Sequence, residues 1–512
     1  MVNRVKTASV VGLNAYEVSV ETDVVNSLPA VTIVGLPDAS VTEARDRVKS
    51  AIKNSGYTFP SKKVVINLAP ADLKKAGTGF DLPIAVGILV EEEVLTAEQV
   101  KDYAFIGELS LDGAIRPIPG VLPLILGLKE AGIKNVIVPK ANAKEAALNG
   151  EVHIYGAEHL TDVVNHFDTE KLSQTQIDVR KYLSEMNIQD YPFDFKDVKG
   201  QSKAKKALEI AAAGGHNLLM TGSPGSGKTL MAKCFPSILP PLELEEALEL
   251  TKIYSICGLL SPDEPLMTKR PFRPVHHTAS ANGIIGGGST PTPGEITLAN
   301  RGVLFLDEMV EFPRQVLEVL RQPLEDGEIV ISRAKHSIKY PAKFMLLGAM
   351  NPCPCGFLGD KEKQCTCTDF QINRYRAKLS GPLLDRIDIQ IDVPRLTPTE
   401  LLAAKDNEED SASIRARVVK ARQIQTERYK NDGILTNAEL NTELLKKYCQ
   451  IDEKSKELMK IAIVKYQLSG RKYDRVLKLA RTIADLCGDE NISQTHLMQA
   501  LQYKMDFNSE QY

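Results

Sequence analysis

One eight-residue segment constrains the fold of this chain more than any other feature of its sequence. Its residues are Gly222, Ser223, Pro224, Gly225, Ser226, Gly227, Lys228 and Thr229. They complete the pattern G-x-x-x-x-G-K-[ST] between a mostly apolar strand candidate at 216–220 and a helix-compatible stretch at 230–234. In this setting the glycines let backbone N–H groups surround phosphates, and the helix N-terminus adds a favourable dipole. The segment therefore predicts a phosphate-binding loop (P-loop) and an α/β nucleotide-binding fold.

The P-loop and a later strand supply the residues of an ATPase. Lys228 is expected to contact the β- and γ-phosphate oxygens of ATP, and the Thr229 hydroxyl to bind Mg²⁺. A second strand candidate, 302–306, ends in Asp307 and Glu308. Asp307 would bind Mg²⁺ through water, and Glu308 would polarise the attacking water.

A third strand candidate, 344–350, leads into Asn351 and then into a cluster of cysteines. The Asn351 amide could orient the water or touch the γ-phosphate, although an Asn before Pro is also ordinary turn chemistry. The cysteines are Cys353, Cys355, Cys365 and Cys367, in the pattern C-x-C-x9-C-x-C. Four thiolates could complete a tetrahedral Zn²⁺ site. The alternative is four reduced thiols, or redox pairs, in a loop.

Composition excludes several classes of protein. A chain of 512 residues has room for about three or four domains. Its 43% hydrophobic and 25% charged residues rule out a disordered, collagen-like or disulfide-stapled molecule. The net charge of -3 excludes a uniformly basic nucleic-acid coat but leaves room for a local basic patch. Apolar runs too short for a bilayer, no visible export signal and few cysteines predict a cytoplasmic protein without a membrane partner.

The chain changes character three times along its length. Residues 1–168 alternate β-branched runs with Gly/Pro turns and a few helices, which predicts an α+β domain. Residues 169–195 are polar and are expected to be a linker. In 196–394, strand-like runs alternate with helical patterns, which indicates a mainly parallel sheet with crossover helices. Residues 395–512 show helical spacing, which predicts a helical C-terminal domain.

Several longer segments resemble a known family. Residues 197–394 resemble the AAA+ ATPase domain of the magnesium-chelatase-like branch, and the whole chain resembles the bacterial ComM/YifB family within it. The segments that carry the resemblance are Asp197-Val198-Lys199-Gly200-Gln201, His276-His277-Thr278, Gly286-Gly287-Gly288, Pro293-Gly294-Glu295-Ile296, Leu304-Phe305-Leu306-Asp307-Glu308, Asn351-Pro352-Cys353-Pro354-Cys355-Gly356 and Gly381-Pro382-Leu383-Leu384-Asp385-Arg386-Ile387-Asp388. The resemblance implies a P-loop AAA+ core with a C-terminal helical lid.

The same resemblance assigns roles to arginines. Arg386 resembles the arginine finger that this branch inserts into the ATP site of the neighbouring subunit, where a guanidinium stabilises charge on the γ-phosphate. Without the family, Arg386 could simply pair with Asp385 or Asp388 at a surface. Arg475 resembles the second sensor that contacts nucleotide, with Arg481 as the competing position. A finger that acts on a neighbour implies a ring, and the family implies a homo-hexamer.

The N-terminal domain resembles a different enzyme. The segments 107–113, 117–120 and 131–139 resemble the proteolytic domain of Lon-type proteases, a ribosomal S5 domain 2-like α+β fold with a Ser nucleophile and a Lys base. The corresponding serine segment here reads Gly79-Phe80-Asp81-Leu82-Pro83-Ile84-Ala85, and the lysine segment reads Gly120-Val121-Leu122-Pro123-Leu124. Neither catalytic residue is present. The resemblance therefore implies the fold without the peptidase activity.

A predicted hairpin of two strands, 328–331 and 336–340, carries Arg333, Lys335 and His336 at its tip. Related ring ATPases project such a hairpin into a central pore, where cations contact DNA phosphates. The resemblance implies a hexameric DNA motor, a helicase that promotes branch migration in homologous recombination and natural transformation, with single-stranded or branched DNA and recombination proteins as partners. The alternative is a magnesium-chelatase-like ATPase that remodels a protein partner, against which the fused Lon-like domain argues. A Lon-like protease is disfavoured by the missing Ser and Lys.

Overall fold

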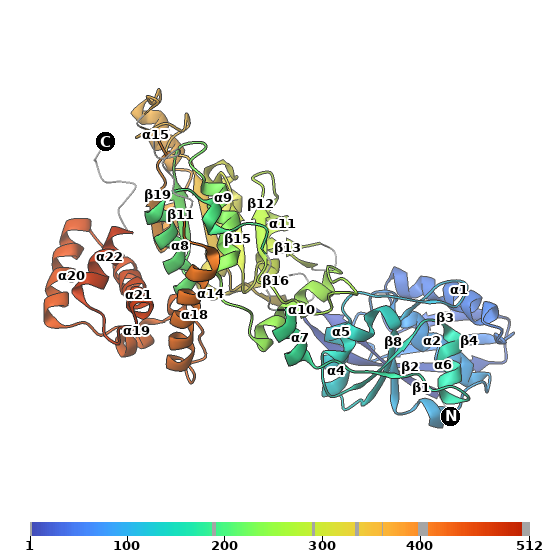
Figure 1. Cartoon of the computed structure of the whole chain (residues 1–512). Coiled ribbons are helices and arrows are strands. Elements are labelled where there is room, and N and C mark those ends of the chain that lie inside the picture. The colour runs from blue at the N-terminus through green and yellow to red at the C-terminus, as the bar shows by residue number, and fades with distance from the viewer. Residues whose placement is uncertain are drawn as a thin grey trace. The chain divides into compact units, whose positions relative to one another are not determined.

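The computed structural model describes residues 3–186, 191–288, 292–332, 337–360, 362–397 and 408–503 (Figure 1). These residues form two compact units. The first unit contains the described residues up to 186, the segment Glu243–Thr268 and residues 337–338, and the second contains the rest. Within the described ranges, no helix combines the length and the apolarity that crossing a bilayer requires.

The first unit is built on a mixed sheet with the strand order β10-β9-β8-β5-β1-β2-β4-β3. Its strands are β1 (Asn3–Val11), β2 (Asn14–Val25), β3 (Ala30–Val34), β4 (Lys63–Ala69), β5 (Tyr103–Phe105), β8 (Asn135–Pro139), β9 (His153–Ala157) and β10 (Gln174–Thr175), with a separate pair β6 (Glu108–Leu109) and β7 (Ile115–Arg116). Its helices include α1 (Ala39–Asn54), α2 (Asp81–Glu91), α3 (Ala97–Val100), α4 (Val121–Glu130), α5 (Ala143–Ala147), α6 (Leu160–Phe167) and α7 (Val179–Met186). The apolar helices α2 and α4 both pack on β1 and β2.

The stretch 169–195, which the sequence assigned to a linker, has structure of its own. β10 pairs antiparallel with β9 at the edge of the sheet, and α7 follows it. At the far end, Phe195 is fully buried in the core of the second unit. A two-residue strand, and a helix whose one buried residue is Leu183, leave no periodicity for the sequence to reveal.

The second unit contains a parallel sheet with the strand order β12-β15-β18-β11-β19. The strands are β11 (Leu218–Thr221), β12 (Phe272–Val275), β15 (Val303–Leu306), β18 (Met345–Met350) and β19 (Ile389–Asp392). β11, β15 and β18 are buried along their whole length, as expected for a sheet covered on both faces. The predicted α/β class with a parallel sheet is confirmed for this unit.

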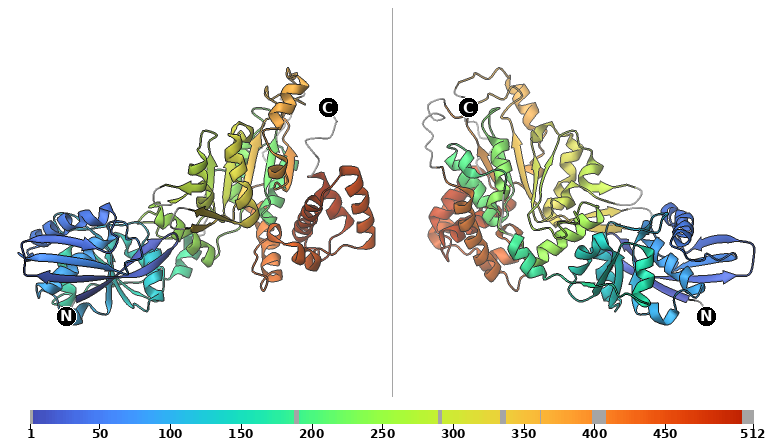
Figure 2. Two further views of the ribbon diagram at one scale, coloured as in Figure 1. Left: turned by 180° about the vertical axis from the view of Figure 1, so that it is seen from behind. Right: turned by 45° about the vertical axis from the view of Figure 1, so that its right-hand side comes forward.

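Helices surround this sheet. α8 (Ser202–Gly214) precedes the first strand of this sheet, and the helices between its strands include α9 (Lys228–Cys234), α11 (Ala281–Ile285), α12 (Glu295–Leu298), α13 (Arg314–Val319), α14 (Arg321–Asp326), α15 (Asp369–Arg376) and α16 (Gly381–Leu384). The C-terminal helices are α18 (Ser411–Arg428), α19 (Thr442–Tyr448), α20 (Glu453–Tyr466), α21 (Gly470–Cys487) and α22 (Gln494–Gln502), and they are orange to red in Figure 2. Of these, α18 and α21 pack against α8.

The helix α10 (Leu244–Ile256) is part of the first unit, although the sequence placed it within the 196–394 domain. The Ser255 carbonyl accepts a hydrogen bond from Gly120 N at 3.0 Å, and the Ser255 hydroxyl donates to Glu145. Glu145 also accepts from Leu122 N, at the first turn of α4, at 2.8 Å. Burial raises the pKa of Glu145. The local sequence of α10 does not reveal that its partner is α4.

A buried ion pair joins α1 to α2. The Arg47 guanidinium donates from Nε to Asp81 Oδ2 at 2.7 Å and from Nη2 to Asp81 Oδ1 at 2.9 Å. Asp81 is fully buried and also accepts from Leu109 N at 3.2 Å. Burial raises the pKa of Asp81, and the hydrogen bonds from Arg47 oppose that shift. The bidentate pair therefore compensates a carboxylate that has lost its water.

Replacing Arg47 with Met should leave the Asp81 carboxylate buried without its ionic partner. We expect the free energy of unfolding of the first unit to fall by about 3 kcal/mol at pH 7. The pKa of Asp81 would rise further, so the deficit should grow as the pH rises through the folded-state pKa and shrink below it, where the carboxyl is neutral. Urea denaturation followed by circular dichroism measures both effects.

The matched control is Arg45→Met on the same helix. Arg45 pairs with Asp46 at 3.2 Å, with 52% and 77% of the two side chains exposed. An exposed pair of this kind contributes between 0 and about 1 kcal/mol, so this variant should unfold almost as the unaltered chain does. Equal losses in the two variants would contradict the role assigned to the buried pair.

Candidate functional site

The P-loop follows β11 directly and ends where α9 begins. Gly225 and Gly227 have φ angles of 79° and 92°, a left-handed conformation that side chains with a Cβ rarely adopt. Gly222 N donates to Met350 O at 3.1 Å, which ties the start of the loop to the end of β18. The predicted strand–loop–helix arrangement is therefore present.

Lys228 is held inside this loop. Its Nζ donates to Gly222 O at 2.7 Å and to Ser223 O at 3.0 Å, and it lies 3.4 Å from Ser226 Oγ. Only 9% of Lys228 is exposed. Burial lowers its pKa to about 8, and the negative charges of Asp307 and Glu308 oppose this shift. The ammonium group thus lies on backbone carbonyl groups that phosphate oxygens could replace.

The acidic pair and the P-loop meet at the carboxyl-terminal ends of the parallel strands. β11 and β15 are both parallel to β18, so the residues that follow them lie together at the carboxyl end. Thr229 Oγ1 donates to Asp307 Oδ2 at 2.8 Å, and Asp307 Oδ1 accepts from Glu308 N at 3.0 Å. A hydroxyl and a carboxylate within hydrogen-bond distance are the hard oxygen ligands that Mg²⁺ prefers. The residues present therefore fit the predicted magnesium site.

Sequence reasoning missed His277 as a site residue. It follows β12, the neighbour of β15, and its Nδ1 lies 3.6 Å from Glu308 Oε2. The ring of His276 lies against that of His277, with centroids 4.1 Å apart. The available signal was a pair of histidines at the end of a strand, but the partner became evident only from the order of strands in the sheet.

Asn351 follows β18 at the same carboxyl edge. It is partly buried, and its Cγ lies 3.8 Å from the position that a Cβ on Gly356 would occupy. That position is also 2.7 Å from Cδ of Pro224 in the P-loop. Asn351, the P-loop and the segment that carries the cysteines are therefore close neighbours.

Arg386 lies at the amino-terminal ends of the parallel strands, opposite the ends that carry the P-loop. It precedes β19, which runs parallel to β11, whereas the P-loop follows β11. Its Nη1 donates to Pro382 O at 2.7 Å and its Nη2 pairs with Glu325. The surface pairing with Asp385 or Asp388 that the sequence left open does not account for Arg386, which is 7% exposed. Burial and the neighbouring arginines lower its pKa.

The two candidates for the second sensor have different surroundings. Arg475 on α21 lies 3.6 Å from Asp388, so it lies at the Arg386 edge of the sheet. Arg481 is 2% exposed and donates to Asp489 O and Glu490 O, both at 2.6 Å. These contacts hold the end of α21 to the loop that follows it. Arg475 as the second sensor, with Arg481 as the competing position, stays a prediction.

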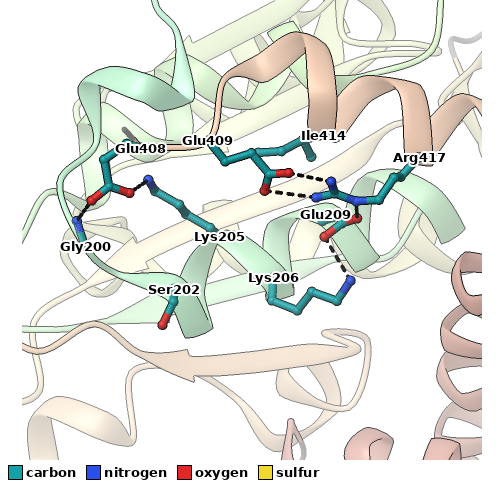
Figure 3. A pocket seen from close by; sticks show the side chains of 9 residues that line it. All are labelled: Gly200, Ser202, Lys205, Lys206, Glu209, Glu408, Glu409, Ile414 and Arg417. Atoms are coloured by element: carbon teal, nitrogen blue, oxygen red, sulfur yellow. Dashed lines mark hydrogen bonds and ion pairs between the residues drawn. The ribbon is translucent and has the colours of Figure 1, made fainter. Parts of the chain in front are cut away.

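A cavity of about 420 Å³ lies beside α8 (Figure 3). Figure 3 shows its charged side chains paired with one another across the opening. Lys205 binds Glu408 at 2.7 Å, and Arg417 binds Glu209 at 2.6 Å. The cations in this lining are thus already neutralised, and the network connects α18 to α8. Arg417 of α18 is therefore bound to α8 rather than solvated.

The predicted DNA contacts Arg333, Lys335 and His336 lie outside the described residues. The strands that flank them are present as β16 (Glu328–Ser332) and β17 (Ser337–Pro341), which form a two-stranded sheet. The two predicted strands are therefore present and paired, and the DNA contact of Arg333, Lys335 and His336 stays a prediction.

The structure brings the four predicted cysteines together. Cys353 Sγ lies 3.3 Å from Cys355 Sγ and 3.6 Å from Cys365 Sγ, and the last two sulfurs are 3.5 Å apart. Cys355 N donates to Cys367 Sγ at 3.4 Å. All four sulfurs lie within 4.8 Å of one another. In a tetrahedral site with Zn–S bonds of about 2.3 Å, sulfurs are separated by about 3.8 Å, so this cluster has suitable dimensions.

Three family models match successive parts of the chain. Residues 20–142 match a model described as subunit ChlI of Mg-chelatase, and residues 194–401 match one described as magnesium chelatase, subunit ChlI. Residues 408–504 match a model of the ChlI C-terminal region.

Similar proteins cover nearly the whole chain. Uncharacterized protein YifB of Salmonella typhimurium is 43% identical over 98% of this chain and 96% of its own length. Competence protein ComM of Haemophilus influenzae is 43% identical over 96% of this chain and 95% of its own length. The magnesium-chelatase 38 kDa subunit of Cereibacter sphaeroides is 28% identical, but over 31% of this chain and 53% of its own length.

The lowered pKa of Lys228 predicts a pH dependence of nucleotide affinity. Phosphate favours the charged ammonium group, so affinity should be lost as the pH rises above the free-state pKa of about 8. We expect the dissociation constant for a fluorescent ATP analogue to rise about tenfold between pH 7 and pH 9. In Lys228→Arg, whose guanidinium stays charged, any remaining binding should lack this slope. The same slope in both proteins would assign the titration to another group.

Proposed function

Because the chain belongs to the ComM/YifB family of magnesium-chelatase-like AAA+ ATPases, we propose that it is an ATP-driven hexameric motor that moves along DNA. In the proposed role it is a helicase that promotes branch migration during homologous recombination and natural transformation, in the cytoplasm and together with recombination proteins. The similarity to Competence protein ComM, which extends over nearly both chains, supports a role in competence.

The carboxyl edge of the sheet would bind and hydrolyse ATP. Lys228 would exchange the loop carbonyls for phosphate oxygens, which suit its charge better. Mg²⁺, held by Thr229 and Asp307 when bound, would neutralise phosphate charge. Glu308 would accept the proton of the attacking water, and His277 beside it would fix the orientation of that carboxylate.

Asn351 completes the proposed set from its place at the end of β18. Its amide can donate one hydrogen bond and accept another, which is what orienting a water molecule requires. The P-loop, the acidic pair and Asn351 thus come from three adjacent parallel strands. The cofactors that this proposal requires are ATP and Mg²⁺; Zn²⁺ at the cysteine cluster would take no part in hydrolysis.

The position of Arg386 is the observation that carries the proposal of a shared site. Four-residue strands of about 13 Å separate the edge that holds Arg386 from the edge that holds the P-loop of the same chain. We therefore propose that the Arg386 guanidinium acts on the γ-phosphate bound by another copy of the chain. A head-to-tail contact forms a ring when its rotation closes, and we propose a closed hexamer in which Arg475 acts from the same end of the strands as Arg386.

For the first unit we propose a Lon-like fold without peptidase activity. At the segment where Lon-type proteases carry their serine, this chain has Asp81, bound on both oxygens by Arg47. At the lysine segment it has Leu122, whose backbone N–H is bound by Glu145. Neither position offers an unbound nucleophile or base. The unit would serve assembly or substrate engagement, and the second unit's C-terminal helices would form the lid.

A protein-remodelling ATPase is the second candidate. All three matching family models carry magnesium-chelatase descriptions, including the one that covers residues 20–142. Because residues 20–142 match a model with a magnesium-chelatase description, the N-terminal domain no longer argues against a chelatase-like role. The greater coverage of the competence relative, 96% of this chain against 31% for the chelatase subunit, favours the DNA motor.

A forked-DNA unwinding assay separates the two candidates. We expect the unaltered protein to displace the labelled strand only with ATP and Mg²⁺, and DNA to stimulate its ATP turnover several-fold. Lys228→Ala should show neither activity, because the phosphates lose their cation. Turnover that is indifferent to DNA, without strand displacement, would contradict the DNA motor and favour the remodelling role.

A further inference from the structure

We propose that the four clustered cysteines bind one Zn²⁺ ion and that the loop they close braces the P-loop, so that metal occupancy strengthens nucleotide binding. The inference rests on the proposed ATPase function for its second half. The proposed Zn²⁺ site is inferred from the positions of the four sulfur atoms, and it does not depend on similarity to another protein.

The sulfur geometry supports a closed structural site. Two C-x-C pairs from the two ends of one loop approach each other, with sulfur separations of 3.3 to 3.6 Å across three of the thiols. The fourth thiol, Cys367, accepts a hydrogen bond from Cys355 N. Four sulfur ligands without an open position are typical of structural zinc rather than of catalytic zinc.

The first contact with the P-loop is steric. Gly356, one residue beyond Cys355, has a φ angle of 83°, and a Cβ built on it would lie 2.7 Å from Cδ of Pro224. No side chain fits in that space. The backbone of the cysteine loop therefore packs directly on Pro224 of the P-loop, in a loop that must stay fixed to cradle phosphate.

The second contact is polar. The Asp360 carboxylate lies between the two cysteine pairs, and the neighbouring Ser223 hydroxyl lowers its pKa. Asp360 Oδ1 accepts hydrogen bonds from Glu362 N at 2.9 Å and from Lys363 N at 3.0 Å. Asp360 thus fixes the turn of the cysteine loop and links that turn to a buried residue of the P-loop.

These contacts connect metal binding to nucleotide binding. Without an ion, nothing covalent holds the two cysteine pairs together, and the intervening segment gains conformational freedom. The P-loop then loses its neighbours at Ser223 and Pro224, and nucleotide must supply the free energy that orders it. We expect a dissociation constant five- to tenfold higher for the zinc-free protein.

The first measurement is the metal content of the full-length protein by inductively coupled plasma mass spectrometry. We expect about one zinc per chain in the unaltered protein and none in Cys365→Ser/Cys367→Ser. Cys257→Ser is the matched control, because Cys257 belongs to the first unit and, among the described residues, to no group of clustered ligand atoms. Unaltered protein without zinc after purification in zinc-supplemented buffer would overturn the metal site.

The second measurement is the dissociation constant for a fluorescent ATP analogue. The double cysteine variant and the chelator-treated unaltered protein should both bind five- to tenfold more weakly than the zinc-loaded protein. Asp360→Ala should bind more weakly while it keeps its zinc, which separates the contact from the metal. Equal affinity for the ATP analogue with and without zinc would overturn the proposal that the cysteine loop stabilises the P-loop. Failure to displace DNA strands would count against the proposed DNA motor. It would not change the zinc content or the affinity for the ATP analogue.

Discussion

The parallel pairing of β11 with both of its neighbours is the constraint on which the account depends. Leu218 is in register with Leu347 of β18 on one side and with Ile389 of β19 on the other. The shared direction places the residues that follow β11, β15 and β18 at one edge, and the residues that precede β19 at the other. The carboxyl-terminal ends of the strands therefore carry the groups proposed to bind and cleave ATP, and the opposite ends carry Arg386.

Both reactive cations are occupied within the isolated chain. Lys228 donates to carbonyl groups of its own loop, and Arg386 pairs with Glu325. Burial lowers the pKa of each, so each gains from a partner with more negative charge. Nucleotide would provide that partner for Lys228, and the nucleotide of a neighbouring chain would provide it for Arg386. On nucleotide binding, Lys228 would thus exchange the carbonyl groups of its own loop for phosphate oxygens. On assembly, Arg386 would exchange Glu325 for the nucleotide of a neighbouring chain.

The parts of the site that are local in sequence could be predicted, and the parts that depend on distant contacts could not. The P-loop, the Asp307–Glu308 pair and Asn351 each follow an apolar strand, so the pattern places them at strand ends. His277 and Glu325 depend on pairings across the fold that no local spacing encodes. The same holds for α10, whose local sequence gave no sign that its partner is α4.

The most direct test of the shared site mixes two variants that are each inactive alone. Lys228→Ala destroys the cradle but keeps the guanidinium at the other edge, whereas Arg386→Ala keeps the cradle and removes the guanidinium. In rings assembled at random from equal amounts, about a quarter of the sites would combine an intact cradle with an intact neighbouring arginine. The account predicts that ATP turnover in the mixture recovers to about that fraction of the unaltered rate. Turnover that stays at the sum of the two variants, or Arg386→Ala that hydrolyses ATP at the normal rate, would contradict it.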